Sequence, residues 1–183
     1  MAAGAKGGGS ASEPLPGHYS HSFGASPPLS VGVEEELLLV DEERRLVAAS
    51  EAVIDSISGP LAGRVSSEIF TEQIELKTGI CHGAAEVLRD LREARQAVLE
   101  AGFGLLGSGL HPDARSGDVR LVAKPRYEIV RRDLGSLLRT PPCGLHVHVG
   151  MPDPETAVRI ANAFRRYLPA LQALSRKDSS VTR

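Results

Sequence analysis

Three consecutive glutamates in the segment GVEEELLLV (32–40) limit what this chain can fold into more than any other feature. The β-branched entry, the leucine run and the length of the segment predict a β-strand that begins near Ser30. Side chains at positions i and i+2 of a strand point to the same face, so Glu34 and Glu36 share one face. Glu35 then faces away, and we expect it to be structural.

Two carboxylates on one strand face repel each other once they lose contact with water. A raised pKa, an arginine partner or a divalent cation can relieve that repulsion. Acidic runs more often simply face water, so a solvated charge cluster is the ordinary alternative. Other segments of the sequence are needed to distinguish these interpretations.

Two further segments place polar groups on strand faces. In TEQIELKTG (71–79), alternation sets Glu75 among polar side chains, with apolar residues behind it. In CGLHVHVG (143–150), His146 and His148 share one face and the apolar residues share the other. Three such strands predict one sheet whose open face is an active site. Carboxylates combined with an imidazole suit Mg²⁺ or Mn²⁺ better than a structural zinc.

Histidine pairs of the HxH type also occur on the strands of cupin-like barrels and binuclear hydrolases. Only a predicted helix and a short tail follow His148, which counts against a barrel. These residues alone do not exclude a metal-dependent hydrolase. Glu68 is a further acidic residue, but an unbroken strand over 65–76 would place it on the opposite face from Glu75, so we leave it out.

Hydrophobic periodicity and turn residues predict the remaining elements. They are a hairpin return at 45–47, a helix capped by Ser50, a helix over 84–101, strands at 103–106 and 119–123, and a helix capped by Asp153. The last helix has Pro154 at its first position, an apolar stripe from Ala157 to Leu171 that we expect to be buried, and a kink at Pro169. Strands and helices do not alternate as βαβ units, which predicts an α+β fold with a mainly antiparallel sheet and helices packed on one face.

Composition and charge exclude several classes of partner. The net charge of −2 over 183 residues provides no basic surface for nucleic acid or an anionic membrane. Residues 1–29, rich in Gly, Ala, Ser and Pro, predict a disordered arm without the apolar stretch of a signal peptide. No segment is long and apolar enough to span a membrane, and Cys81 and Cys143 lack the spacing of a disulfide framework or zinc site. We therefore expect free thiols and a cytoplasmic protein that acts on small molecules.

Taken together, these motifs resemble a known family. The segments GVEEELLLVD, TEQIELKTGIC, GSGLHP, RYEIV and CGLHVHVGMPDPETAVRIANAFRRYLPALQALS have the order and spacing of the carboxylate-amine ligases of the glutamate–cysteine ligase type 2 family. The resemblance covers residues 30–175 and corresponds to the N-terminal half of such a ligase. It implies a glutamine-synthetase-like catalytic fold, in which an antiparallel sheet forms the floor for ATP, divalent metals and an amino-acid substrate.

The resemblance also implies a reaction and its site residues. A member of the family uses ATP to phosphorylate a carboxylate of glutamate, and an amine such as that of cysteine then displaces phosphate to form a γ-glutamyl amide. Arg126 can contact phosphate or a substrate carboxylate, and His148 can support the site. The residues that match the family's ligands for Mg²⁺ or Mn²⁺ are Glu34, Glu36, Glu75 and His146.

The sequence departs from the family pattern at its C-terminal end. Residues 176–183 form a polar tail, where family members continue into a second half. We therefore expect a truncated chain with an exposed sheet edge and an incomplete site. The alternative to a ligase is accordingly a non-catalytic fragment or a module that binds metal or an amino acid. A homo-oligomer or a complementing chain would then complete the active enzyme.

Overall fold

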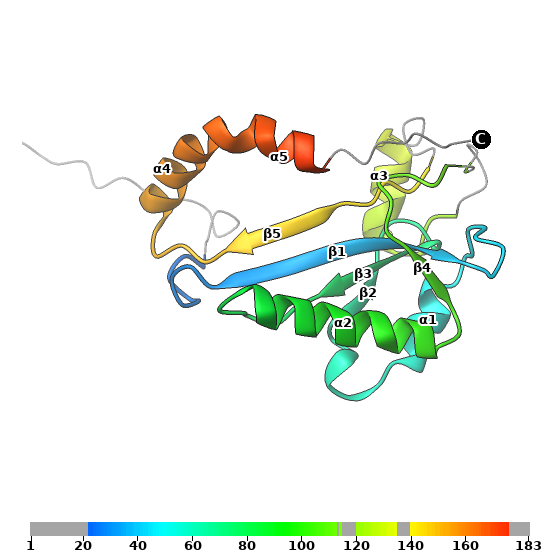
Figure 1. Ribbon diagram of the computed structural model, residues 1–183. Helices are drawn as coiled ribbons and strands as arrows, with labels where there is room; N and C mark the ends of the chain where they lie inside the picture. Colours follow the sequence, from blue (N-terminus) through cyan, green and yellow to red (C-terminus); the bar gives the residue numbers. More distant parts are fainter. Residues whose placement is uncertain (1–21, 113, 115–119, 135–139, 176–183) are drawn as a thin grey trace, which may run out of the picture.

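The chain folds around a five-stranded antiparallel sheet that carries helices (Figure 1). Residues 1–21 of the predicted arm and the predicted tail at 176–183 lie outside the described residues. At the end of the arm, the N–H of Gly24 donates to the carbonyl of Met151 at 3.0 Å. The computed structural model describes residues 22–112, 114, 120–134 and 140–175.

The order of the elements confirms the predicted α+β class. The strands are β1 (Val31–Val40), β2 (Val65–Ser67), β3 (Gln73–Lys77), β4 (Gly104–Leu106) and β5 (Leu145–Val149). The helices are α1 (Ser50–Ser56), α2 (Ala84–Glu100), α3 (Pro125–Leu134), α4 (Pro154–Phe164) and α5 (Leu168–Ser175), with short 3₁₀ turns η2 (Gly59–Leu61) and η3 (Arg165–Tyr167). All the strand pairings of this sheet are antiparallel.

β1 lies at the centre of the sheet. β3 pairs with it along one edge, where Glu36 lies opposite Glu75. β5 and β4 pair with successive stretches of the other edge, at 31–35 and 38–40. β2 continues the sheet beyond β3. Side chains of β1 therefore meet those of β3 on one side and those of β5 on the other.

One face of the sheet carries the hydrophobic core. α1 and α2 lie on this side of the sheet (Figure 1). Their buried aliphatic side chains form one cluster with those of β1 and β3. Burying one such side chain stabilises a fold by about 1.5–3 kcal/mol. Alternation along each strand assigns these residues to one face, as predicted. The strand residues of this core include Val33, Leu37, Leu39, Ile74 and Leu76.

Glu35 points to the core face, which confirms its predicted separation from Glu34 and Glu36. Its carboxylate accepts a hydrogen bond from Arg95 Nε of α2 at 2.7 Å and a second one from Arg95 Nη2. A guanidinium that binds a carboxylate with two donors fixes both side chains. Glu35 is therefore a structural residue that ties α2 to β1.

The predicted single strand over 65–76 is wrong. β2 ends at Ser67 and β3 begins at Gln73, and the two strands form a hairpin in which Ser66 lies opposite Glu75. The segment is longer than a usual strand of about 5–6 residues, and its polar residues allow a turn. Alternation along one strand therefore no longer fixes the direction of Glu68.

Three other local predictions are corrected. Ser50 does not cap α1, because it is the first helical residue and its buried Oγ finds no hydrogen-bond partner in the described part of the chain. The segment 125–134, for which the sequence predicts no element, forms α3. The predicted strand at 119–123 is reduced, in its described residues, to an isolated bridge between Leu121 and Phe70.

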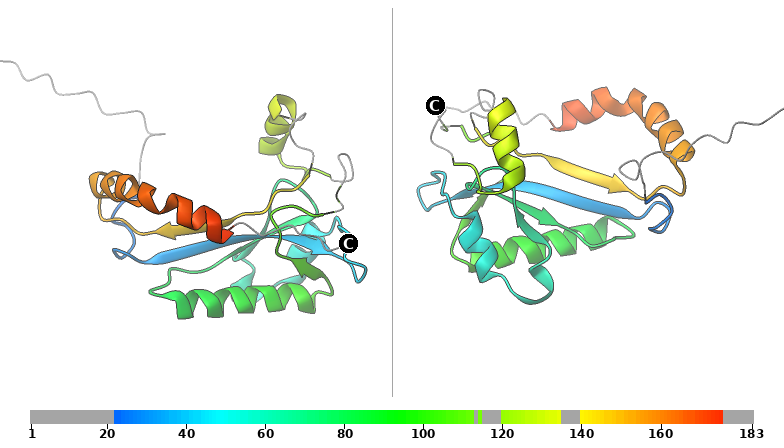
Figure 2. Two further views of the ribbon diagram at one scale, coloured as in Figure 1. Left: turned by 45° about the horizontal axis from the view of Figure 1, so that its top comes forward. Right: turned by 180° about the vertical axis from the view of Figure 1, so that it is seen from behind.

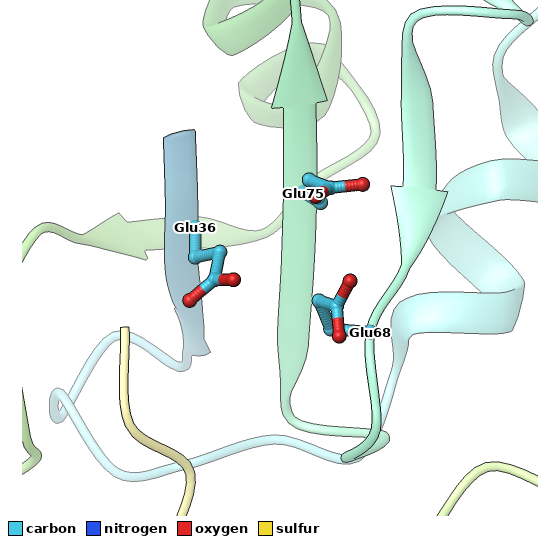
Figure 3. Close-up of side chains that lie close together, drawn as sticks. All are labelled: Glu36, Glu68 and Glu75. Atoms are coloured by element: carbon cyan, nitrogen blue, oxygen red, sulfur yellow. The ribbon is translucent and has the colours of Figure 1, made fainter. Parts of the chain in front are cut away.

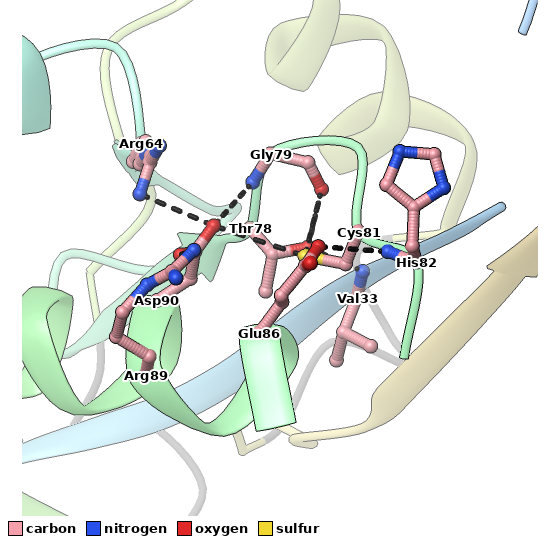
Figure 4. Close-up of polar contacts among 9 residues, drawn as sticks. All are labelled: Val33, Arg64, Thr78, Gly79, Cys81, His82, Glu86, Arg89 and Asp90. Atoms are coloured by element: carbon pink, nitrogen blue, oxygen red, sulfur yellow. Dashed lines mark hydrogen bonds and ion pairs between the residues drawn. The ribbon is translucent and has the colours of Figure 1, made fainter. Parts of the chain in front are cut away.

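The loop after β3 is held by Asp90, a buried residue of α2 (Figure 4). Asp90 Oδ2 accepts a hydrogen bond from the N–H of Gly79 at 3.0 Å and lies 3.3 Å from Arg64 Nη1. The Cys81 thiol donates to the same oxygen at 3.8 Å. In the same loop, Thr78 Oγ1 accepts from a backbone N–H of β1 at 2.9 Å. These contacts connect α2 to the end of the strand that carries Glu75.

α4 begins where the sequence predicts it. The Asp153 side chain accepts a hydrogen bond from the N–H of Thr156 at 2.7 Å, and Pro154 occupies the first turn. The 3₁₀ turn η3 separates α4 from α5 just before Pro169, which confirms the predicted kink. No described helix combines the length and the apolar character needed to cross a bilayer.

The predicted burial of the α4–α5 stripe is wrong. Phe164 is 48% exposed and Leu171 is 43% exposed, and neither α4 nor α5 contains a buried residue. Both helices lie on the side of the sheet opposite α2 (Figure 2), so the prediction of helices packed on one face holds only for α1 and α2. An amphipathic pattern fixes which side of a helix is apolar but not what covers it.

Replacing Leu171 by alanine is expected to lower the free energy of unfolding by no more than about 1 kcal/mol, because the side chain is 43% exposed and lies outside the hydrophobic core. The same substitution at Leu39, which is 0% exposed, is expected to cost about 2–5 kcal/mol. Urea denaturation followed by circular dichroism measures both values. A loss for Leu171→Ala as large as that for Leu39→Ala would show that α5 packs against the fold in solution.

Candidate metal and substrate site

Carboxylates gather on the open face of the sheet, where β1, β3 and the end of β2 meet. Glu36 of β1 and Glu75 of β3 lie directly opposite each other in the register. Glu68 follows β2 and lies beside them (Figure 3). Each of the three can contribute one oxygen such that all three oxygens lie within 4.8 Å of one another. We call Glu36, Glu68 and Glu75 the carboxylate cluster.

The backbone and neighbouring side chains orient two members of the cluster. Glu36 Oε2 accepts a hydrogen bond from the N–H of Gly144 at 2.8 Å and lies 3.4 Å from Gln73 Nε2. Glu75 Oε2 accepts from the Ser66 hydroxyl at 2.9 Å. Glu75 is 6% exposed, so the strand pairing places a carboxylate where little water reaches it. Such partners hold the oxygens in place for a ligand.

Glu34 forms a second polar group beside the cluster. Its Oε2 lies 3.0 Å from His148 Nε2 and 3.6 Å from His146 Nδ1, because β5 pairs with β1 at this point. The hydrogen bond with His148 lowers the pKa of Glu34. The structure therefore brings Glu34 together with both histidines, and the assignment of Glu34 and His146 as metal ligands stays a prediction.

Lys77 lies between the cluster and Glu34. Its Nζ is 2.6 Å from Glu75 Oε2 and 3.8 Å from Glu34 Oε1. The hydrogen bond to Glu75 raises the pKa of Lys77, so the ammonium stays charged at neutral pH. The open face therefore holds a protein cation among its carboxylates.

The remaining residues that the sequence motifs single out are Arg126 and the two cysteines. Arg126 belongs to α3, but its side chain lies outside the described residues. Burial, with the nearby charge of Glu36, raises the pKa of the Cys143 thiol to about 12. Cys143 therefore stays protonated at neutral pH, and Cys81 and Cys143 are both free thiols, as predicted.

Sequence reasoning missed Glu68. The alternation rule excludes it only for an unbroken strand over 65–76, whereas the chain turns back between Ser67 and Gln73. The length of the segment was the available signal, because a run of this size more often contains two short strands and a turn. A hairpin there places the residue after β2 near Glu75 of β3.

The chemistry of the cluster fits a hard divalent cation. Three carboxylate oxygens within 4.8 Å of one another can converge on one ion, and Mg²⁺ and Mn²⁺ prefer oxygen ligands. Carboxylates this close together repel one another, and a cation between them would relieve that repulsion. The arrangement therefore makes the cluster a candidate site for a divalent cation.

An open antiparallel sheet with a carboxylate cluster on its exposed face defines an α+β protein with a candidate divalent-cation site. Residues 30–176 match the model of the glutamate-cysteine ligase family 2. The match extends over most of the chain, and the chain belongs to this family. This finding confirms the resemblance that the sequence motifs indicate.

Individual relatives agree with the family match. The chain is 40% identical over 152 residues to a putative glutamate–cysteine ligase 2-1 of Rhodococcus jostii, covering 80% of this chain and 41% of that protein. It is 37% identical over 156 residues to a glutamate–cysteine ligase of Halobacterium salinarum, covering 80% of this chain and 42% of that protein. The chain thus spans about two fifths of the length of these curated relatives.

Proposed function

We propose that this chain takes part in ATP-dependent ligation of a glutamate carboxylate to an amine such as that of cysteine. The supporting observation is the carboxylate cluster on the open face of a sheet whose sequence belongs to the glutamate-cysteine ligase family 2. The proposal includes a glutamine-synthetase-like catalytic fold and a cytoplasmic location, where ATP and both substrates are present.

In the proposed reaction, the γ-phosphate of ATP is transferred to the γ-carboxylate of glutamate, which gives γ-glutamyl phosphate and ADP. The amine then attacks the acyl carbon, loses a proton and displaces phosphate, so that an amide bond forms. Bound Mg²⁺ or Mn²⁺ would supply neutralising charge for the phosphates. Glu36, Glu68 and Glu75 would hold the cation, and Glu34 with His146 would extend the ligand set along β1 and β5.

Remaining residues of the open face have proposed roles in binding and orientation. His148 holds Glu34 at 3.0 Å and would keep its carboxylate directed into the site. The Gly144 N–H would keep Glu36 in place in the same way. Arg126 would pair with a phosphate or a substrate carboxylate, since its guanidinium matches both in geometry.

One observation favours a second candidate, in which the chain binds ligands without turning them over alone. Leu145 and Val147 of β5 are 61% and 60% exposed although their strand belongs to the sheet. Additional protein would be needed to cover this part of the sheet, and a second copy or a complementing chain could provide it. On this proposal, activity appears only in the assembled protein.

Release of ADP tests the proposed function. We expect ADP only when Mg²⁺, ATP, glutamate and an amine are all present, and we expect Glu36→Gln to abolish it. Light scattering on the same sample gives the oligomeric state in which activity occurs. Cation and nucleotide binding without ADP release in any assembly would support the non-catalytic module instead, and hydrolysis that needs no ATP would contradict both.

A further inference from the structure

Lys77 is placed to compete with a cation for the carboxylate cluster. It ends β3 directly opposite Glu34, and alternation puts its side chain on the same open face as Glu75. Its ammonium lies 2.6 Å from Glu75 Oε2, and the Lys77 side chain is 39% exposed whereas that of Glu75 is 8% exposed. The lysine thus approaches a nearly buried carboxylate from the solvent side.

An ammonium and a divalent cation cannot both use the same carboxylate oxygen freely. Two positive charges a few ångströms apart repel each other, and burial strengthens that repulsion because little water screens it. Lys77 also has a second acceptor within reach, since Glu34 Oε1 lies 3.8 Å from its Nζ. The flexible four-carbon side chain of lysine lets the ammonium move from Glu75 to Glu34 without a change in the backbone.

We propose that Lys77 is a built-in counter-ion that sets the cation affinity of the open face: it neutralises Glu75 in the cation-free protein and must move away when a divalent cation binds the carboxylate cluster. This inference rests on the proposed cation site and extends it to a residue outside the ligand set. Lys77 is accordingly a positioning residue, and its charge lowers the affinity for Mg²⁺ or Mn²⁺ while it stabilises the protein without them.

The test compares Mn²⁺ binding by wild-type chain, Lys77→Met and the charge-matched control Arg92→Met. Arg92 is an exposed residue of α2, on the other side of the sheet, so its loss changes the net charge equally but not the cluster. Electron paramagnetic resonance of free Mn²⁺ gives the dissociation constants. We expect Lys77→Met to bind about tenfold more tightly, whereas Arg92→Met should match the wild type.

A second readout separates a counter-ion from a merely structural lysine. Without Mn²⁺, Lys77→Met is expected to have a lower melting temperature than the wild type, and saturating Mn²⁺ should remove most of the difference. Lys77→Gln, checked for folding by circular dichroism, should behave in the same way. Unchanged or weaker Mn²⁺ binding by both folded variants would overturn the proposal.

The outcome for Lys77 can be distinguished from the outcome for the ligase function. A chain that shows the expected order of Mn²⁺ affinities but releases no ADP would contradict the ligase function and leave the role of Lys77 intact. The role of Lys77 alone would be overturned if the wild-type chain released ADP but bound Mn²⁺ with the same affinity as Lys77→Met. Absence of Mn²⁺ binding in every variant would overturn both.

Discussion

Replacing Glu75 by glutamine is expected to weaken Mn²⁺ binding by about a hundredfold or more, because a hard cation loses a charged oxygen ligand in a site with little water. Glutamine keeps the size of the side chain and can still accept a hydrogen bond from Ser66. Titration with Mn²⁺ at fixed ionic strength measures the change.

Glu35→Gln provides the matched control for this result. Glu35 precedes Glu36 in the chain but faces the core side, where it binds Arg95. Its substitution removes the same charge from the neighbouring strand β1, but on the opposite face of the sheet, so we expect it to leave the Mn²⁺ dissociation constant within about twofold. If folded Glu75→Gln bound Mn²⁺ as tightly as Glu35→Gln does, the carboxylate cluster would not be the cation site.

Replacing Asp90 by alanine is expected to lower the free energy of unfolding by about 2–4 kcal/mol at neutral pH, because buried donors lose their acceptor. The N–H of Gly79 donates to Asp90 Oδ2 at 3.0 Å, Arg64 Nη1 lies 3.3 Å from the same oxygen, and Asp90 is 4% exposed. Urea denaturation measures the loss, and Asp55→Ala, at an exposed position of α1, is the control with an expected change under about 0.5 kcal/mol.

The contribution of Asp90 should also depend on pH. The hydrogen bond from Gly79, together with the charges of Arg64 and Arg89, lowers the pKa of Asp90 below its ordinary value of 3.8. A carboxyl group whose pKa is lower in the folded state stabilises the fold fully above its unfolded value and loses that contribution as pH falls through the folded value. The difference between wild type and Asp90→Ala should therefore shrink below about pH 4. A difference that grows on acidification would contradict this account.

Strand alternation made the polar face predictable from sequence. It separated Glu35 from Glu34 and Glu36, and it put His146 and His148 together, because side-chain direction in a strand depends only on position along it. The register between strands then brings Glu34 next to both histidines. This register depends on contacts between distant segments, which local pattern does not contain.

Two features could not be obtained from local pattern. Glu68 joins the cluster only because the chain reverses between β2 and β3, and a turn without glycine or proline gives a weak sequence signal. The apolar side of α4 and α5 is visible in the sequence, but whether it is buried depends on which surface meets it. Phe164, which the pattern assigns to a buried stripe, is 48% exposed.

Calorimetric titration with a non-hydrolysable ATP analogue tests the central claim most directly, namely that the open face assembles a cation-dependent nucleotide site. We predict binding by the wild-type chain that requires Mg²⁺ and is lost in Glu36→Gln, with Glu35→Gln as the folded control that retains it. Equal binding with and without Mg²⁺, or by Glu36→Gln as tightly as by the wild type, would contradict the claim.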